Sequence, residues 1–120
     1  MTEGTAILVV DDDPEVRPLA ATILKEAGFD VLEAASGDQA FQLLDRHREI
    51  ALLFTDIVMP GIDGFVLADR AKALRPDLKV IYATSYSEAL RANRLIVHGA
   101  VLAKPYKPRD LEASIRRALG

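Results

Sequence analysis

Four carboxylates stand at the ends of two apolar runs, where they could assemble into one site. The aspartates at 11–13 directly follow the apolar run 6–10, and Asp56 directly follows the run 51–55. If the two runs are neighbouring parallel strands, their carboxyl ends deliver these side chains to one spot. Like charges repel, so the cluster needs a compensating cation, usually a divalent metal with oxygen ligands. The pattern predicts a small Mg²⁺-dependent site that handles phosphate.

The residue types define what such a site could do. Asp12 and Asp56 are the candidates for direct Mg²⁺ ligation, with Asp11 acting through water, because Mg²⁺ needs only one or two protein carboxylates. A carboxylate can also be the nucleophile, which would give an aspartyl phosphate. The transferred phosphoryl group needs its charge neutralised, for which Mg²⁺ and Lys104 are available, and it needs hydrogen bonds, which the Thr84 hydroxyl can donate.

An alternation of strands and helices would position these residues. Apolar runs predict strands at 6–10, 31–32, 51–55, 79–83 and 101–103, and helical patterns follow each of them, the fourth at 88–96. Five strands alternating with five helices indicate an α/β fold, one parallel sheet covered on both faces. Ligands bind such sheets at the carboxyl ends of the strands. The predicted rim of the site is Asp11, Asp12, Asp56, Thr84 and Lys104.

Helix boundaries and faces can also be predicted. The first helix is expected to open at Asp13-Pro14, a capping aspartate followed by a first-turn proline, and to end at Gly28. Its apolar stripe is expected to include Leu19, and the third helix, closed by Arg75-Pro76, is expected to turn Leu74 inward. The stretch at 63–64, Asp-Gly, is interpreted mainly as turn chemistry.

Composition excludes several classes of protein. The chain has 120 residues, half of them hydrophobic and 28% charged, which fits one globular domain spanning 1–120. The net charge of −3 argues against direct nucleic-acid binding. The absence of cysteine excludes disulfides and thiol chemistry, and is compatible with a cytoplasmic location. No apolar stretch has transmembrane length, the start does not resemble a signal peptide, and His47 and His98 lack metal-ligand spacing.

The chain resembles a response-regulator receiver domain (CheY-like, of two-component signalling) along essentially its whole length. The matching pieces are Val-Val-Asp-Asp-Asp-Pro at 9–14, Thr-Asp-Ile-Val-Met-Pro-Gly-Ile-Asp-Gly at 55–64, Ala-Thr-Ser at 83–85 and Lys-Pro-Tyr at 104–106. Each piece is weak alone, but all four in order at strand ends are specific. The resemblance implies a flavodoxin-like, doubly wound sheet of strand order 2-1-3-4-5.

The resemblance also implies a mechanism and partners. It implies phosphorylation of Asp56 by a histidine kinase or a histidine phosphotransfer protein, with Mg²⁺ held by Asp11, Asp12, Asp56 and the backbone carbonyl of Val58. By the same resemblance, Thr84 supplies the switching hydroxyl and Lys104 pairs with the phosphate. The peptide bond between Lys104 and Pro105 would be cis. The chain would be no enzyme apart from catalysing its own phosphorylation and dephosphorylation. It would signal to a downstream protein effector through its fourth helix, fifth strand and last helix, and a phosphorylation-dependent dimer is compatible with this.

Three departures from the family pattern concern the way the signal leaves the site. Val101 stands where the family often has an aromatic switch residue, three positions before the lysine. The stretch 99–104 before that lysine is shorter than usual, and 82–86, Tyr-Ala-Thr-Ser-Tyr, loosely resembles a subgroup with Phe-Ala-Thr-Gly.

Two further positions concern the lifetime of the phosphoryl group. Val58 and Tyr86 stand where family side chains flank the water that attacks phosphorus. Neither side chain should orient a water, so slow autodephosphorylation is expected.

Two other functions fit parts of the pattern. The aspartates at 11–13 contain the Asp-x-Asp of Mg²⁺-dependent phosphatases with an aspartyl-phosphate intermediate, like the haloacid-dehalogenase group, which usually need more chain for a substrate cap. A non-phosphorylated docking module is the other alternative, against which the complete set of acids, threonine and lysine speaks. The sequence is compatible with a stand-alone receiver and with a piece of a hybrid kinase or larger regulator.

Overall fold

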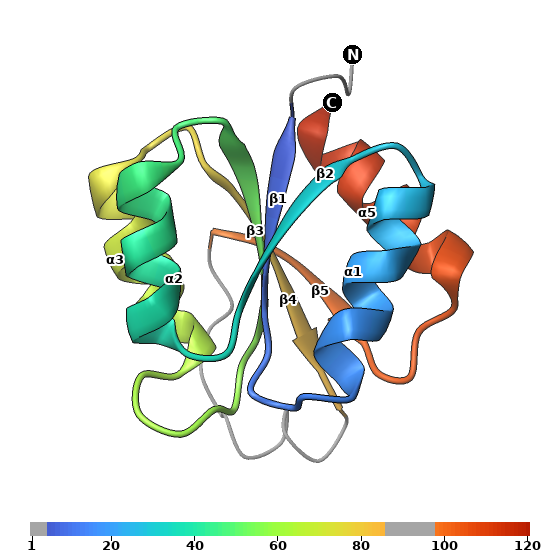
Figure 1. Ribbon diagram of the computed structural model, residues 1–120, viewed down its shortest axis with the longest axis horizontal. Helices are drawn as coiled ribbons and strands as arrows, with labels where there is room; N and C mark the ends of the chain where they lie inside the picture. Colours follow the sequence, from blue (N-terminus) through green and yellow to red (C-terminus); the bar gives the residue numbers. More distant parts are fainter. Residues whose placement is uncertain (1–4, 86–97) are drawn as a thin grey trace.

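Five strands form one parallel sheet in the computed structural model, which describes residues 5–85 and 98–120 (Figure 1). The strands are β1 (Ala6–Val10), β2 (Asp30–Ala34), β3 (Ile50–Asp56), β4 (Lys79–Thr84) and β5 (Gly99–Ala103). Their order is β2-β1-β3-β4-β5, and every neighbouring pair is parallel. The predicted α/β sheet and its strand order are confirmed.

Helices cover both faces of the sheet. Figure 1 shows α1 (Val16–Glu26) and α5 (Pro108–Leu119) on one side, and α2 (Gly37–Arg46) and α3 (Gly64–Leu74) on the other. The helix predicted at 88–96 lies outside the described residues. Across the described part of the chain, no helix is both long and apolar enough to cross a membrane.

The central strands are apolar on both faces because each face meets a helical layer. All five residues of β1 are buried. Ile7 and Val9 belong to the core under α1 and α5, whereas Leu8 and Val10 belong to the core under α2 and α3. Successive side chains of a strand point to opposite faces, so a strand between two cores needs a continuous apolar run. This explains why the run at 6–10 predicts its own position so well.

Helix α1 begins at Val16, later than the predicted opening at Asp13-Pro14. Pro18 has no N–H, so the carbonyl of Pro14 cannot receive the usual helical bond from four residues ahead. The Asp13 side chain still makes cap-like contacts, because its Oδ1 accepts hydrogen bonds from the N–H groups of Glu15 (2.8 Å) and Val16 (3.3 Å). The prediction that Asp13 is the N-cap residue is wrong, because Glu15 holds that position without a side-chain cap and Asp13 acts in the turn before it.

Two leucines predicted to be buried are exposed. Leu19 on α1 is 65% exposed and Leu74 at the end of α3 is 69% exposed. Helix α1 packs through Ala20, Ala21 and Leu24, whose two alanines allow a close approach to the sheet and leave Leu19 pointing outward. The predictions that both leucines face inward are wrong, and each leucine is part of the protein surface.

Helix α3 has a side-chain cap that the turn interpretation of the Asp-Gly pair does not include. Asp63 is the N-cap residue, and its Oδ1 accepts a hydrogen bond from the N–H of Val66 at 2.9 Å. Gly64 is the first residue of the helix, and its N–H donates to the carbonyl of Ile57 at 2.7 Å. This arrangement fixes the start of α3 directly against the end of β3.

Candidate functional site

The carboxylates predicted to meet do meet at one edge of the sheet. β1 and β3 are hydrogen-bonded neighbours, so Asp11, directly after β1, lies beside Asp56, the last residue of β3. One carboxylate oxygen each from Asp11, Asp12 and Asp56 lie within 4.8 Å of one another. Asp11 and Asp56 are buried, whereas Asp12 is exposed. The cluster therefore combines a buried floor with a side that solvent can reach.

Lys104 faces the same cluster from the end of β5. Its Nζ lies 3.1 Å from Oδ2 of Asp56 and 3.7 Å from Oδ2 of Asp11. The backbone N–H of Lys104 donates to the carbonyl of Thr84 at 2.8 Å, which ties the lysine to the end of β4. The bond between Lys104 and Pro105 is cis, as predicted. The cation is thus positioned by two strand ends and by the backbone that follows.

Backbone contacts fix the carboxylate of Asp56. Its Oδ1 accepts a hydrogen bond from the N–H of Ile57 at 2.9 Å. Its own carbonyl accepts one from the buried hydroxyl of Thr55 at 2.8 Å. The same carbonyl lies against Gly64, where an added Cβ would come within 2.2 Å of that oxygen. Only glycine lets the start of α3 approach the strand end so closely.

Burial makes the charge on Asp11 costly. Loss of hydration raises the pKa of the Asp11 carboxyl, and the hydrogen bond from Asp13 and the charge of Lys104 oppose that rise. In that hydrogen bond, the N–H of Asp13 donates to Oδ1 of Asp11 at 2.9 Å. A carboxylate that is buried beside two other acids gains from any additional cation.

Mg²⁺ fits this set of donors. The three acids offer hard carboxylate oxygens within reach of one ion, the ligand type that Mg²⁺ prefers. Among the described groups here, the carboxylates outnumber the ammonium of Lys104, so negative charge remains to be balanced. The exposed side of Asp12 leaves space for the waters that Mg²⁺ retains. The acidic pocket is consistent with the predicted cofactor.

The structure describes three of the remaining residues singled out in the sequence. Thr84 ends β4 and is buried, and its hydroxyl donates to the carbonyl of Ser85 at 3.1 Å. Val58 follows Asp56 by two residues, with a side chain that is 42% exposed. Val101 on β5 is equally exposed. Tyr86 lies outside the described residues.

Tyr106 is packed into the structure. Its ring meets that of Phe54 edge to face, with centroids 5.9 Å apart, and belongs to the fringe of the core under α1 and α5. Burial raises the pKa of its phenol. The sequence alone is compatible with core packing or with a switching role for Tyr106, and these contacts support core packing.

The histidines take no part in the acidic cluster found among the described residues. His98 Nε2 lies 2.7 Å from Asp69, and His47 Nδ1 lies 3.0 Å from Glu49.

An apolar groove adjoins the site. It has a volume of about 730 Å³ and is lined by Val16, Leu19 and Ile23 of α1, and by Pro105 and Tyr106 after β5. Lys104 also lines it, so the groove and the acidic cluster share a residue. Leu19 adds a large exposed apolar side chain to this surface. Large exposed apolar patches commonly mark interaction sites.

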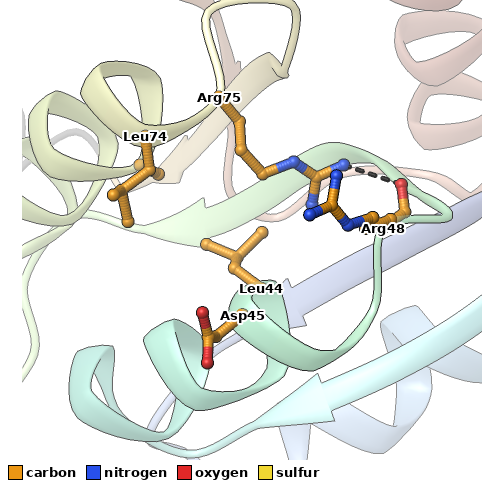
Figure 2. Close-up of a pocket in the computed structure, with 6 residues that line it drawn as sticks. Leu44, Asp45, Arg48, Leu74 and Arg75 are labelled. Atoms are coloured by element: carbon orange, nitrogen blue, oxygen red, sulfur yellow. Dashed lines mark hydrogen bonds between the residues drawn. The ribbon is translucent and has the colours of Figure 1, made fainter.

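A second pocket lies at the opposite edge of the sheet. It is formed between the ends of α2 and α3, with Leu44, Asp45, Arg48, Leu74 and Arg75 around it (Figure 2). The guanidinium of Arg75 donates to the carbonyls of His47, Arg48 and Ile50, which ties α3 to the loop that enters β3. This pocket is built around a structural contact at the amino ends of the strands, away from the carboxylates.

Two residues near the carboxylates were not predicted from the sequence. Arg17 on α1 donates from Nη1 to the carbonyl of Asp11 at 2.8 Å. Gly64 permits the close contact with Asp56. The sequence does carry a signal for Arg17, because a basic residue in the first turn of a helix faces an unfavourable helix dipole and needs a specific partner. The sequence carries no signal for the close approach of Gly64 to the Asp56 carbonyl.

Comparisons with known proteins agree with the geometry. The family model of the response regulator receiver domain matches residues 7–116. Response regulator receiver protein CpdR of Brucella abortus is 37% identical over 115 residues, which cover 94% of this chain and 95% of that protein. Sensor kinase CckA of Brucella abortus is 29% identical over 122 residues, 99% of this chain and 13% of the kinase.

A solved structure shows the same fold. The crystal structure of the receiver domain from hybrid histidine kinase CckA superposes with a TM-score of 0.81 at 32% identity, covering 96% of this chain and 99% of that one. Fold, order of strands and acidic cluster thus coincide with the family match over most of the chain. The chain belongs to the response regulator receiver domains of two-component signalling.

Proposed function

We propose that this receiver domain accepts a phosphoryl group on Asp56 from a histidine kinase or a histidine phosphotransfer protein. The observation that carries the proposal is the position of the Asp56 carboxylate, which lies 3.1 Å from the ammonium of Lys104 and within reach of Asp11 and Asp12. A nucleophile for phosphoryl transfer needs neighbouring groups that neutralise the incoming phosphate, and these residues could provide them directly and through a metal.

The transfer is a single displacement. A carboxylate oxygen of Asp56 forms a bond to phosphorus while the N–P bond of the donor phosphohistidine breaks, and the bonding pair stays on the imidazole nitrogen. When bound, Mg²⁺ would be held by Asp12, Asp56 and the carbonyl of Val58, with Asp11 through water, and would neutralise charge on the phosphoryl oxygens. The backbone bond from Ile57 holds the nucleophilic carboxylate in place.

The output would begin at Thr84. Its hydroxyl donates to Ser85 in this structure, and a phosphoryl group on Asp56 would offer it a charged acceptor instead. That exchange would favour a second arrangement of β5, α5 and the helix predicted at 88–96, and the altered face would regulate a downstream protein or support a dimer. With Val101 in place of an aromatic residue, this rearrangement would proceed without a rotating aromatic ring.

The phosphodonor would dock on the apolar groove. A phosphohistidine must come within bonding distance of Asp56, so its protein has to cover the edge of the site. The groove is continuous with that edge through Lys104, and Leu19 offers an exposed apolar anchor on it. We propose a single domain over 1–120, located in the cytoplasm with its donor, that works through protein contacts without binding nucleic acid directly.

One experiment separates this proposal from its two alternatives. Incubation with acetyl phosphate and Mg²⁺ is expected to increase the intact mass of the protein by one phosphoryl group. The Asp56→Asn variant should show no such increase, and neither should the wild-type protein when Mg²⁺ is omitted. Asp45→Asn, an exposed acid on α2 at the opposite edge, is the matched control and should be modified normally. Turnover of a foreign phosphate ester would instead support a phosphatase, and no modification at all would support a docking module.

The phosphorylated form is expected to be long-lived. The side chain of Val58 is apolar and that of Tyr86 is bulky, so neither should orient the water that attacks phosphorus. Loss of the phosphoryl group in Mg²⁺ buffer, followed by intact mass, should therefore be slow compared with receivers that carry polar residues at both positions. A lifetime of seconds would contradict this expectation, and Val58→Asn should accelerate the loss.

A further inference from the structure

The backbone that carries the expected metal ligands is held by a side chain outside the acidic cluster. Arg17 donates from Nη1 to the carbonyl of Asp11 at 2.8 Å. Its Nε lies 3.4 Å from Oε1 of Glu33, and its side chain is only 19% exposed. Because Glu33 lies on β2, directly opposite Val9 of β1, the guanidinium joins helix α1 to β2 and to the residue that follows β1.

The bond to the Asp11 carbonyl acts on Asp12. The carbonyl of Asp11 and the N–H of Asp12 belong to one rigid peptide plane. Fixing the oxygen of that plane fixes the direction in which the chain leaves for Asp12. The N–H of Asp11 is already held by the carbonyl of Ala34 at 3.2 Å, so with Arg17 the backbone is tied on both sides of the Asp11 side chain.

We propose that Arg17 is a positioning residue for the Mg²⁺ ligands Asp11 and Asp12. The inference rests on the proposed function, because it assumes that these carboxylates bind the metal. Ligand orientation by groups outside the coordination sphere contributes strongly to metal affinity, typically by about 10–100-fold per contact. The planar fork of arginine suits this role, since one guanidinium can bond a carboxylate and a carbonyl together.

The positive charge of Arg17 would change the affinity for Mg²⁺ in the opposite direction from its positioning role. A guanidinium near the carboxylates repels Mg²⁺, so a residue that acted through charge alone would weaken binding, and its removal would tighten it. A positioning residue has the reverse signature, because its removal loosens the ligands and weakens binding. The sign of the change in Mg²⁺ affinity therefore separates the two roles.

The test is titration of the protein with MgCl₂, monitored by calorimetry and by amide chemical shifts. Arg17→Met is expected to raise the Kd for Mg²⁺ by about tenfold, the lower end of the effect of such contacts. Arg17→Lys keeps the charge but loses the fork, and should show a similar loss. The matched control is Arg46→Met, which removes an exposed arginine at the far end of α2 and should leave Kd unchanged.

The outcomes are distinguishable. An unchanged or lower Kd in folded Arg17→Met and Arg17→Lys, alongside normal binding by the wild-type protein, would overturn the role of Arg17 and leave the proposed function standing. Absence of Mg²⁺ binding by the wild-type protein would overturn both. In metal-free protein, shifted amide signals of Asp12 and Asp13 in Arg17→Met would support the positioning role even if that variant is less stable, and unchanged signals would contradict it.

Discussion

Replacing Gly64 with alanine is expected to lower the free energy of unfolding by about 3 kcal/mol, the upper part of the range for overpacking. The new Cβ would come within 2.2 Å of the Asp56 carbonyl oxygen and 2.9 Å of the Ile57 Cα, which are both backbone atoms. Neither can turn aside as a flexible side chain would, so α3 and the end of β3 must separate. Thermal unfolding should show a decrease in Tm on the order of 10 °C.

Gly37→Ala is the matched control for this prediction. Gly37 and Gly64 are each the first residue of a helix, and each follows a residue whose side chain caps that helix. At Gly37 the nearest contact of a new Cβ would be Cβ of Ile62 at 3.1 Å, which asks for a displacement of only a few tenths of an ångström. Gly37→Ala should therefore destabilise the protein much less than Gly64→Ala does. Equal stability of the two variants would contradict the close packing of Gly64 on Asp56.

Leu19→Glu is expected to slow phosphotransfer from the partner histidine kinase without changing phosphorylation by acetyl phosphate. Loss of an apolar anchor and burial of a charge in the groove should cost at least about 2 kcal/mol of docking energy, or about 30-fold in kcat/KM for transfer. Acetyl phosphate needs no docking surface. Because Leu19 is 65% exposed, its replacement should not impair folding.

Leu74→Glu provides the control, since Leu74 is a similarly exposed leucine, 69% accessible, on the opposite helical layer at the far edge of the sheet. Autophosphorylated histidine kinases of the source organism would first be screened for the fastest donor, and transfer to each variant would then be timed. If both variants are equally slow, or Leu19→Glu is as fast as the wild-type protein, the donor does not dock on the groove.

The fold was predictable where burial leaves a simple pattern. Strands between two helical layers must be apolar on both faces, so β1 and β3 could be located from sequence alone. The faces of the helices were harder. The apolar stripe on α1 includes more residues than the core accepts, because Ala20, Ala21 and Leu24 are buried whereas Leu19 is exposed.

Some contacts of the site could likewise be predicted from the sequence, and others could not. Asp11, Asp12, Asp56 and Lys104 could be predicted to meet, because each lies at or next to the carboxyl end of a strand and parallel strands end at one edge. The contact of Arg17 with Glu33 could not, because it depends on the tilt of α1 and on the pairing of β2 with β1, which brings Glu33 into reach. Contacts between elements far apart in the chain leave no local pattern.

The most direct test of Asp56 as the phosphoacceptor is to locate the phosphoryl group. Protein phosphorylated with acetyl phosphate and Mg²⁺ would be reduced with borohydride, which converts an aspartyl phosphate to homoserine, then digested and mapped by mass spectrometry. We expect homoserine at position 56 alone, and none when Mg²⁺ is omitted. Homoserine at position 11 or 12, or a phosphoryl group retained on serine, threonine or histidine, would contradict the assignment of Asp56 as the phosphoacceptor.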